Sequence, residues 1–267
     1  MTRRDQAFFS FVLLMLGAGW GITQPLTKIA VSTGYGHFGL IFWQLVVGAL
    51  AMGFIAVLRG TRMPFTRPAL KIYVIIAIIG TVIPNSASYQ AIAHLPSGVI
   101  SILLSLIPMI AFPMALGLGL ERFSLRRFAG LFAGLVGVSL LILPKASLPD
   151  PAMLAWMPVA LVSSFFYAFE GNYVAKWGTE GLDAIQVMFG ASLIGGVIVL
   201  PLALGSNQFI SPFRIWGAPE WALVASSLIH VLVYAGYVWL VGRAGPVFSV
   251  QVSYLVTGFG VTWAMLI

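Results

Sequence analysis

The sequence predicts an all-α polytopic membrane protein, with ten helices arranged as two inverted five-helix repeats. Three observations lead to this prediction: an apolar composition, nine long apolar segments, and a repeat at a fixed offset. Of the 267 residues, 60% are hydrophobic and 8% are charged, and the mean hydropathy is +1.01. Soluble domains carry about 25% charged residues, so the composition predicts a chain whose solvent is lipid.

Each of the nine apolar segments is long enough to cross a bilayer as a helix, which takes about 20 residues. They lie at about 6–32, 38–58, 69–92, 96–119, 124–143, 155–177, 184–204, 220–242 and 246–267. Their apolar runs are continuous and lack the alternation of barrel strands, so we expect helices, which satisfy their own backbone polar groups in hydrocarbon. The first segment is too long for a signal peptide, and we expect it to be retained.

Charged and reactive residues exclude several classes of protein. Cysteine is absent, which excludes disulfides and thiolate metal sites, and we expect no cofactor and no metal. The net charge of +7 does not indicate nucleic-acid binding, because the basic residues cluster at segment ends. With the N-terminus placed in the cytoplasm, eleven of the fourteen Lys and Arg residues face inside, the distribution typical of a bacterial inner-membrane protein.

An internal repeat appears when the sequence is shifted by 148 residues. The shift places Lys28 on Lys176 and Gly48 on Gly196, and it matches further pairs in the same order. These are Pro64-Phe65 with Pro212-Phe213, Ala87 and Tyr89 with Ala235 and Tyr237, and Ser101 and Ser105 with Ser249 and Ser253. The unit of five helices is odd, so the second copy must enter the membrane in the opposite sense. Inverted repeats of this kind are a common plan of secondary transporters.

The repeat divides the chain into residues 1–147 and 148–267, which together form one membrane domain. The second copy holds four of the five expected helices, because the segment at 124–143 would map beyond Ile267. We therefore expect a tenth helix that is missing from this sequence or not ordered.

Three stretches resemble one known family when they are taken in order. They are WGITQPLTK at 20–28, YQAIAHLPSGVISILLSLIP at 89–108 and LGLERFSLRRFAGLFAGLVGV at 118–138. The series resembles the drug/metabolite transporter superfamily, EamA family, and is most similar to its YddG-type exporters of aromatic and other neutral amino acids. The resemblance implies ten helices in two inverted repeats and the export of small molecules.

Polar residues inside spans are costly and usually face a cavity or a neighbouring helix. Several spans carry such residues at i, i+3, i+4 spacing, and Ser and Thr also serve as interhelical hydrogen-bonding residues. Deep aromatic residues either stack on a substrate or pack against helices. The candidate substrate-binding residues are Trp20, Gln24, Asn85, Tyr89, Tyr167, Glu170, His230, Tyr234 and Tyr254.

Glu170 is the only acidic residue in the middle of a span. Three roles stay open for it: binding the amino group of a substrate, carrying a proton, or pairing with Lys176. His230 is the second candidate for proton coupling; the alternative is a neutral histidine satisfied by Ser226, Ser227 or Tyr234. Lys28 and Lys176 are interpreted mainly as anchors that reach the headgroups from the ends of their helices.

Pro25, Pro84 and Pro108 interrupt apolar segments, and each removes one helical hydrogen bond. They are expected to be either static kinks or gates of a central cavity.

The function expected from these features is export of aromatic and other neutral amino acids across the inner membrane by alternating access. Other small metabolites or drugs, and a non-transporting scaffold or channel, are the alternatives. An intramembrane enzyme is not expected, because there is no pair of intramembrane Asp, no His cluster and no serine–histidine motif. We expect the protein to work as a monomer, with the lipid bilayer and a small-molecule substrate as its partners.

Overall fold

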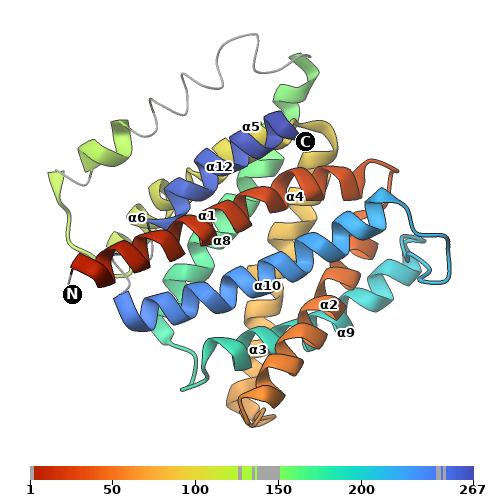
Figure 1. Cartoon of the computed structure of the whole chain (residues 1–267), viewed down its shortest axis with the longest axis horizontal. Helices are drawn as coiled ribbons and strands as arrows, with labels where there is room; N and C mark the ends of the chain where they lie inside the picture. Colours follow the sequence, from red (N-terminus) through yellow and green to blue (C-terminus); the bar gives the residue numbers. More distant parts are fainter. Residues whose placement is uncertain (1–2, 126–127, 134–135, 137–150, 245–247, 249–250) are drawn as a thin grey trace.

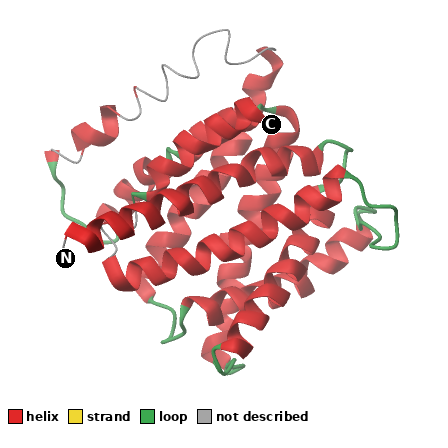
Figure 2. Ribbon diagram, viewed as in Figure 1, coloured by secondary structure: helices red, strands yellow, loops and turns green. Residues whose placement is uncertain are grey.

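The computed structural model describes residues 3–125, 128–133, 136, 151–244, 248 and 251–267, and every regular element in this part of the chain is helical (Figure 2). The first half holds α1 (Arg3–Val31), α2 (His37–Leu58), α3 (Arg67–Ile76), the π-helix η1 (Ala77–Val82), α4 (Ile83–His94), α5 (Ser97–Leu104) and α6 (Ile107–Gly117). The second half holds the 3-10 helix η3 (Pro151–Trp156), α8 (Met157–Trp177), α9 (Ala184–Gly205), α10 (Ala218–Ala244) and α12 (Val252–Leu266).

The helix ends follow local chemistry. Thr66 caps α3 by accepting from the Ala69 N–H, with a proline in the first turn. Asp183 and Gln186 form a reciprocal capping box at the start of α9. Gly178 ends α8 with φ of 72°, a backbone conformation that glycine adopts without steric cost.

Eight of the nine apolar segments correspond to described helices. Seven of these are long and apolar enough to span a membrane, and α12 is a shorter apolar helix. The segment at 69–92 is one span, Arg67–His94, with η1 in its middle, and the segment at 96–119 is one span, Ser97–Gly117, with a turn between α5 and α6. The segment expected at 124–143 is helical at 125, 128–133 and 136, and its remainder lies outside the described residues.

Helices from the two halves pack against each other in a reciprocal pattern. Helix α1 packs between α10 and α12, and the three run side by side in Figure 1. The offset of the repeat makes α8 the counterpart of α1, and α8 packs on α4 and α6, the counterparts of α10 and α12. Likewise α3 packs on α9 as α10 packs on α2. This is the pairing that a two-fold relation between residues 1–147 and 148–267 would produce, and the division itself stays a prediction.

Close backbone approaches hold the two halves together. At Gly260 in α12, an added Cβ would lie 2.9 Å from the Ser101 Cβ of α5, and at Gly21 in α1 it would lie 2.8 Å from the Gly260 nitrogen. Trp263 in α12 also donates to the Ala18 carbonyl oxygen, at 3.1 Å. Small residues at such crossings let helices pack closely in a membrane, so α1, α5 and α12 form one tight group.

Candidate functional site: a central cavity between the two halves

A cavity of about 400 Å³ lies among the helices of both halves. Its lining comes from α1, α2, α3, η1, α4, α5, α6, α8, α9, α10 and α12, so neither half forms it alone. Pockets for small molecules have volumes of about 300–1,000 Å³. The cavity is therefore large enough for a metabolite-sized ligand.

Eight of the nine residues predicted from the sequence line this cavity. They are Trp20, Gln24, Asn85, Tyr89, Tyr167, Glu170, His230 and Tyr234. The prediction for Tyr254 needs correction, because its side chain is 70% exposed and does not line the cavity. Its neighbour Ser253 does line it, and successive residues of a helix point about 100° apart. Tyr254 therefore lies on a different face of α12.

Trp20 and His230 connect the two halves across the cavity. The Trp20 Nε1–H donates to His230 Nδ1 at 3.2 Å. Because Nδ1 accepts this bond it carries no proton, and the neutral imidazole then has its proton on Nε2. Ser226 and Ser227 both donate to the Leu223 carbonyl oxygen. The hydrogen-bond partner of His230 is therefore Trp20, and not Ser226, Ser227 or Tyr234, the three partners that the sequence suggested.

A second network links α2, α4 and α8. The Gln44 Oε1 accepts hydrogen bonds from Asn85 Nδ2 at 3.0 Å and from the Tyr89 hydroxyl at 2.8 Å. The Tyr167 hydroxyl donates to Asn85 Oδ1 at 2.7 Å. Sequence reasoning did not select Gln44, although it is the only polar side chain between Trp43 and Arg59 in a strongly apolar segment. That isolation was the signal that would have found it.

Glu170 lies beside the π-helix η1. An added Cβ at Gly80 would lie 2.7 Å from the Glu170 Cδ, so the absence of a side chain at Gly80 leaves room for the carboxyl group. Among the described residues, Glu170 forms no hydrogen bond or ion pair. Lys176, one of its suggested partners, donates instead to the Leu118 carbonyl oxygen at 2.8 Å. Direct pairing with Lys176 is therefore not formed, and the substrate and proton roles stay open.

The prolines differ in their effect on the backbone. Pro84 has no N–H for the Gly80 carbonyl oxygen, and the chain adopts the π-helix η1 just before it. Pro108 lies in the first turn of α6, directly after the turn that separates α5 from α6. Pro25 lies inside the continuous helix α1. Pro84 and Pro108 thus coincide with interruptions beside the cavity, whereas α1 continues through Pro25.

A smaller cavity of about 250 Å³ adjoins the central one. The two share Ile76, Glu170, Met188 and Tyr234, and the smaller one continues to Thr179 and Leu182 in the loop after α8. We call the side of the molecule with residues 59–66, 118–124 and 178–183 the Lys176 end. The side with residues 32–36, 95–96 and 206–217 is the Lys28 end. The smaller cavity therefore extends from Glu170 toward the Lys176 end.

Lys28 connects the end of α1 to the end of α4. Its Nζ donates to the carbonyl oxygens of Ile92, Ala93 and Leu95 at 2.6, 3.0 and 3.0 Å. Helices leave their last carbonyl groups without partners inside the helix, and a lysine near a helix C-terminus also interacts well with the helix dipole. Lys28 is thus a cap for α4, where the sequence suggested a headgroup anchor.

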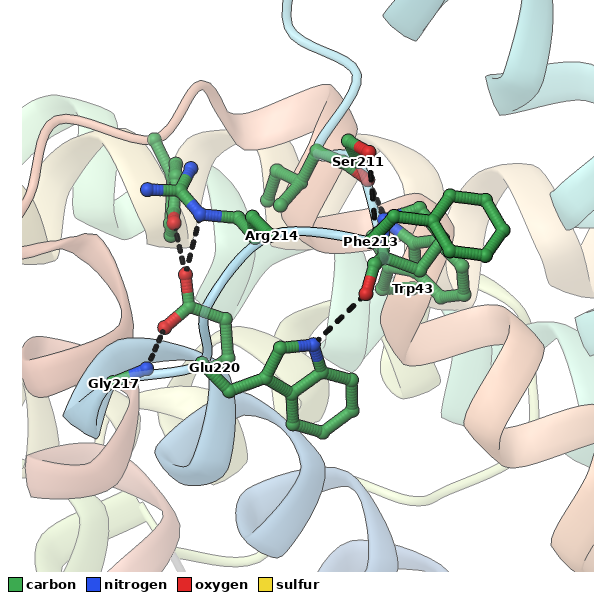
Figure 3. Close-up of polar contacts among 10 residues, drawn as sticks. Trp43, Ser211, Phe213, Arg214, Gly217 and Glu220 are labelled. Carbon is green, nitrogen blue, oxygen red and sulfur yellow. Dashed lines mark hydrogen bonds and ion pairs between the residues drawn. The ribbon is translucent and has the colours of Figure 1, made fainter.

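Glu220 organises the loops at the Lys28 end (Figure 3). Its carboxylate pairs with Arg214 Nε at 3.3 Å, accepts from the Gly217 N–H at 2.8 Å and accepts from the Tyr35 hydroxyl. Burial, with the neighbouring Glu220 carboxylate, raises the pKa of Tyr35, so this phenol stays a donor at neutral pH. The Trp43 indole N–H donates to the Ile210 carbonyl oxygen at 2.8 Å and ties the same loop to α2.

The first half of the chain is similar to a known protein family. The model of the EamA-like transporter family matches residues 8–143, which is half of the chain and nearly all of the first expected repeat. Comparison with curated proteins gave no match. The family match agrees with the all-helical fold and the seven membrane-length helices. The protein is thus a multi-pass membrane protein, and it belongs to the EamA-like transporter family.

Proposed function

We propose that the protein exports aromatic and other neutral amino acids by alternating access through the central cavity. The observation that carries this proposal is the chemistry of the cavity lining. It combines one carboxyl group, Glu170, with amides, hydroxyls and aromatic rings, and it holds no Lys or Arg among its described residues. Such a lining suits a ligand with an ammonium group and an apolar or aromatic body. Phosphorylated substrates would need several cationic side chains.

The arrangement of the helix ends supports alternating access. In its own half, α1 packs against α4 and α5 at the Lys28 end, whereas α8 makes no packing of similar extent with α10 or α12 among the described residues. The smaller cavity lies beside α8, toward the Lys176 end. We propose that this state is closed at the Lys28 end. With the orientation expected from Lys and Arg, the Lys176 end faces the cytoplasm and the membrane is the bacterial inner membrane.

One experiment distinguishes this proposal from its two alternatives, an exporter of other metabolites or drugs and a non-transporting scaffold. A panel of neutral amino acids, sugars and cationic drugs is offered to purified protein in liposomes, with and without a pH gradient. We expect saturable amino-acid flux, with the protein active as a monomer. Saturable flux of only drugs or other metabolites would favour a different exporter of the same superfamily. The absence of flux with every compound would favour a scaffold.

Energy coupling is tested with Glu170→Gln. If Glu170 carries a proton, with His230 as the second titrating group of the cavity, this variant should lose uptake driven by a pH gradient. It should retain measurable downhill exchange at saturating substrate, because the shape of the cavity is unchanged even where the contact to the ammonium group is weakened. Glu180→Gln, in the exposed loop after α8, is the matched control and should behave as the wild type. A Glu170→Gln protein with unaltered pH dependence would show that proton transfer runs elsewhere or that transport is facilitated diffusion.

A further inference from the structure

The side-chain amide of Gln44 has its oxygen and its nitrogen in different environments. Oε1 accepts two hydrogen bonds, from Asn85 and from Tyr89, and an amide oxygen has two lone pairs. Nε2 has no hydrogen-bond partner among the described residues, and Gln44 lines the central cavity. Both N–H groups of Gln44 are therefore available to a ligand.

The direction of the network fixes which group faces the ligand. The Tyr167 hydroxyl donates to Asn85 Oδ1, which leaves Asn85 Nδ2 to donate to Gln44 Oε1. Tyr89 donates to the same oxygen from one helical turn further along α4. Two phenol donors thus start a chain of hydrogen bonds, and the amide N–H groups of Gln44 end it. A partly buried amide held in this way needs no reorganisation when a ligand arrives.

N–H groups that face a cavity favour an acceptor oxygen, most strongly one with negative charge. No Lys or Arg lines the cavity among the described residues, so a carboxylate would have to be met by neutral donors. Glu170 lies on the same wall, because it follows Tyr167 by three residues in α8 and such neighbours have Cβ atoms about 5–6 Å apart. The cavity therefore holds a carboxyl group that could face an ammonium and amide donors that could face a carboxylate.

We propose that Gln44, oriented by Asn85 and Tyr89, binds the carboxylate of a zwitterionic amino-acid substrate and selects it over ligands that lack this group. The inference rests on the proposed function, since it assigns one end of the same substrate. Glu170 then faces the ammonium group. Gln44 is a substrate-binding residue that determines specificity.

The first test uses the wild-type protein with two probes, L-phenylalanine and its methyl ester, which differ in the free carboxylate. Affinities are measured by competition with a radiolabelled substrate on purified protein. We expect the amino acid to bind at least tenfold more tightly than the ester. If both bind equally, Gln44 does not recognise the carboxylate, while the proposed export of amino acids still stands. If neither binds, the proposed function fails and this inference fails with it.

The second test uses Gln44→Glu, which keeps an acceptor for Asn85 and Tyr89 but replaces the N–H donors with a negative charge. We expect its affinity for L-phenylalanine to fall about 10- to 100-fold, because a hydrogen bond to a charged group is lost. Its affinity for the ester, a cation, should be retained or should rise. Thermal unfolding in detergent checks that the variant is folded.

Thr257→Glu is the control, because it adds the same charge to the same cavity from α12, at a residue that is not among the candidate substrate-binding residues. We expect it to change the ratio of the two affinities less than Gln44→Glu does. An equal change in both variants would show a general effect of cavity charge and would overturn the role of Gln44. An equal loss of both ligands in Gln44→Glu would also overturn it, because that result indicates a structural role.

Discussion

Lys28 gives the sharpest test of the proposal that this state is closed at the Lys28 end. Lys28→Met keeps most of the side-chain length and removes all three hydrogen bonds to the C-terminal carbonyl groups of α4. Two of these bonds are partly buried and one is exposed. A buried hydrogen bond to a charged group contributes about 1.5–3 kcal/mol, and the exposed one is replaced by water at little cost. The closed arrangement should therefore lose about 3 kcal/mol.

That loss has a measurable effect on populations. Because 1.4 kcal/mol is a factor of about ten, about 3 kcal/mol changes the equilibrium between closed and open Lys28 ends roughly 100-fold. A protein closed 99% of the time would become open for about half of the time. Transport by alternating access needs both states, so Lys28→Met should also change the transport rate.

The absence of cysteine makes the assay direct. Thr27→Cys places a single thiol in the cavity lining, next to Lys28. Labelling by a membrane-impermeant maleimide is measured in right-side-out and inverted vesicles, with and without Lys28→Met. We expect labelling from the Lys28 side to become at least tenfold faster. The same two preparations establish which end faces the cytoplasm. An unchanged labelling rate, together with an unchanged unfolding temperature, would refute the reasoning.

Two further variants test contacts around the site. Gly80→Ala should leave the unfolding temperature within a few degrees of the wild-type value, since alanine is the better helix former. Its Cβ should displace the Glu170 carboxyl group and slow transport. A wild-type transport rate would show that the position of this carboxyl group is unimportant. Glu220→Gln removes the negative charge that binds Arg214, Tyr35 and Gly217. The free energy of unfolding should fall by about 1–2 kcal/mol, which lowers the unfolding temperature by roughly 2–8 °C. Substrate affinity should be unchanged. A loss of affinity without a loss of stability would place Glu220 in the binding process.

The sequence predicted the spans and most of the cavity lining for one physical reason. Polar side chains are expensive in hydrocarbon, so those that recur at helical spacing, such as Asn85 with Tyr89 and Tyr167 with Glu170, mark a face that is not exposed to lipid. The same reasoning failed for Tyr254, because a tyrosine is tolerated on an outer face. It also missed Gln44, because a single polar residue has no periodicity.

Other features depend on tertiary structure and could not be predicted from sequence patterns. Pro84 indicated an interruption of its span, but a kink and a π-helix have the same sequence signal. The partners of Lys28 lie more than 60 residues away, on a helix end whose position depends on packing. The position of Lys28 at the end of a span therefore suggested contact with the lipid headgroups. A lysine makes that contact when no helix end lies near it.

The two lysines also connect the repeat with the two ends of the molecule. Under the offset of 148 residues, the partners of Lys28 correspond to Leu240, Val241 and Arg243 at the end of α10. In this state, Lys176 donates instead to Leu118, and the smaller cavity lies beside α8. If the repeats exchange conformations, we expect Lys176 to take the α10 carbonyl groups when the Lys28 end opens. Lys176→Met should then slow transport as strongly as Lys28→Met while leaving the labelling of Thr27→Cys no faster than in the wild type. An equal acceleration of labelling in both variants would show that the lysines do not act in opposite states.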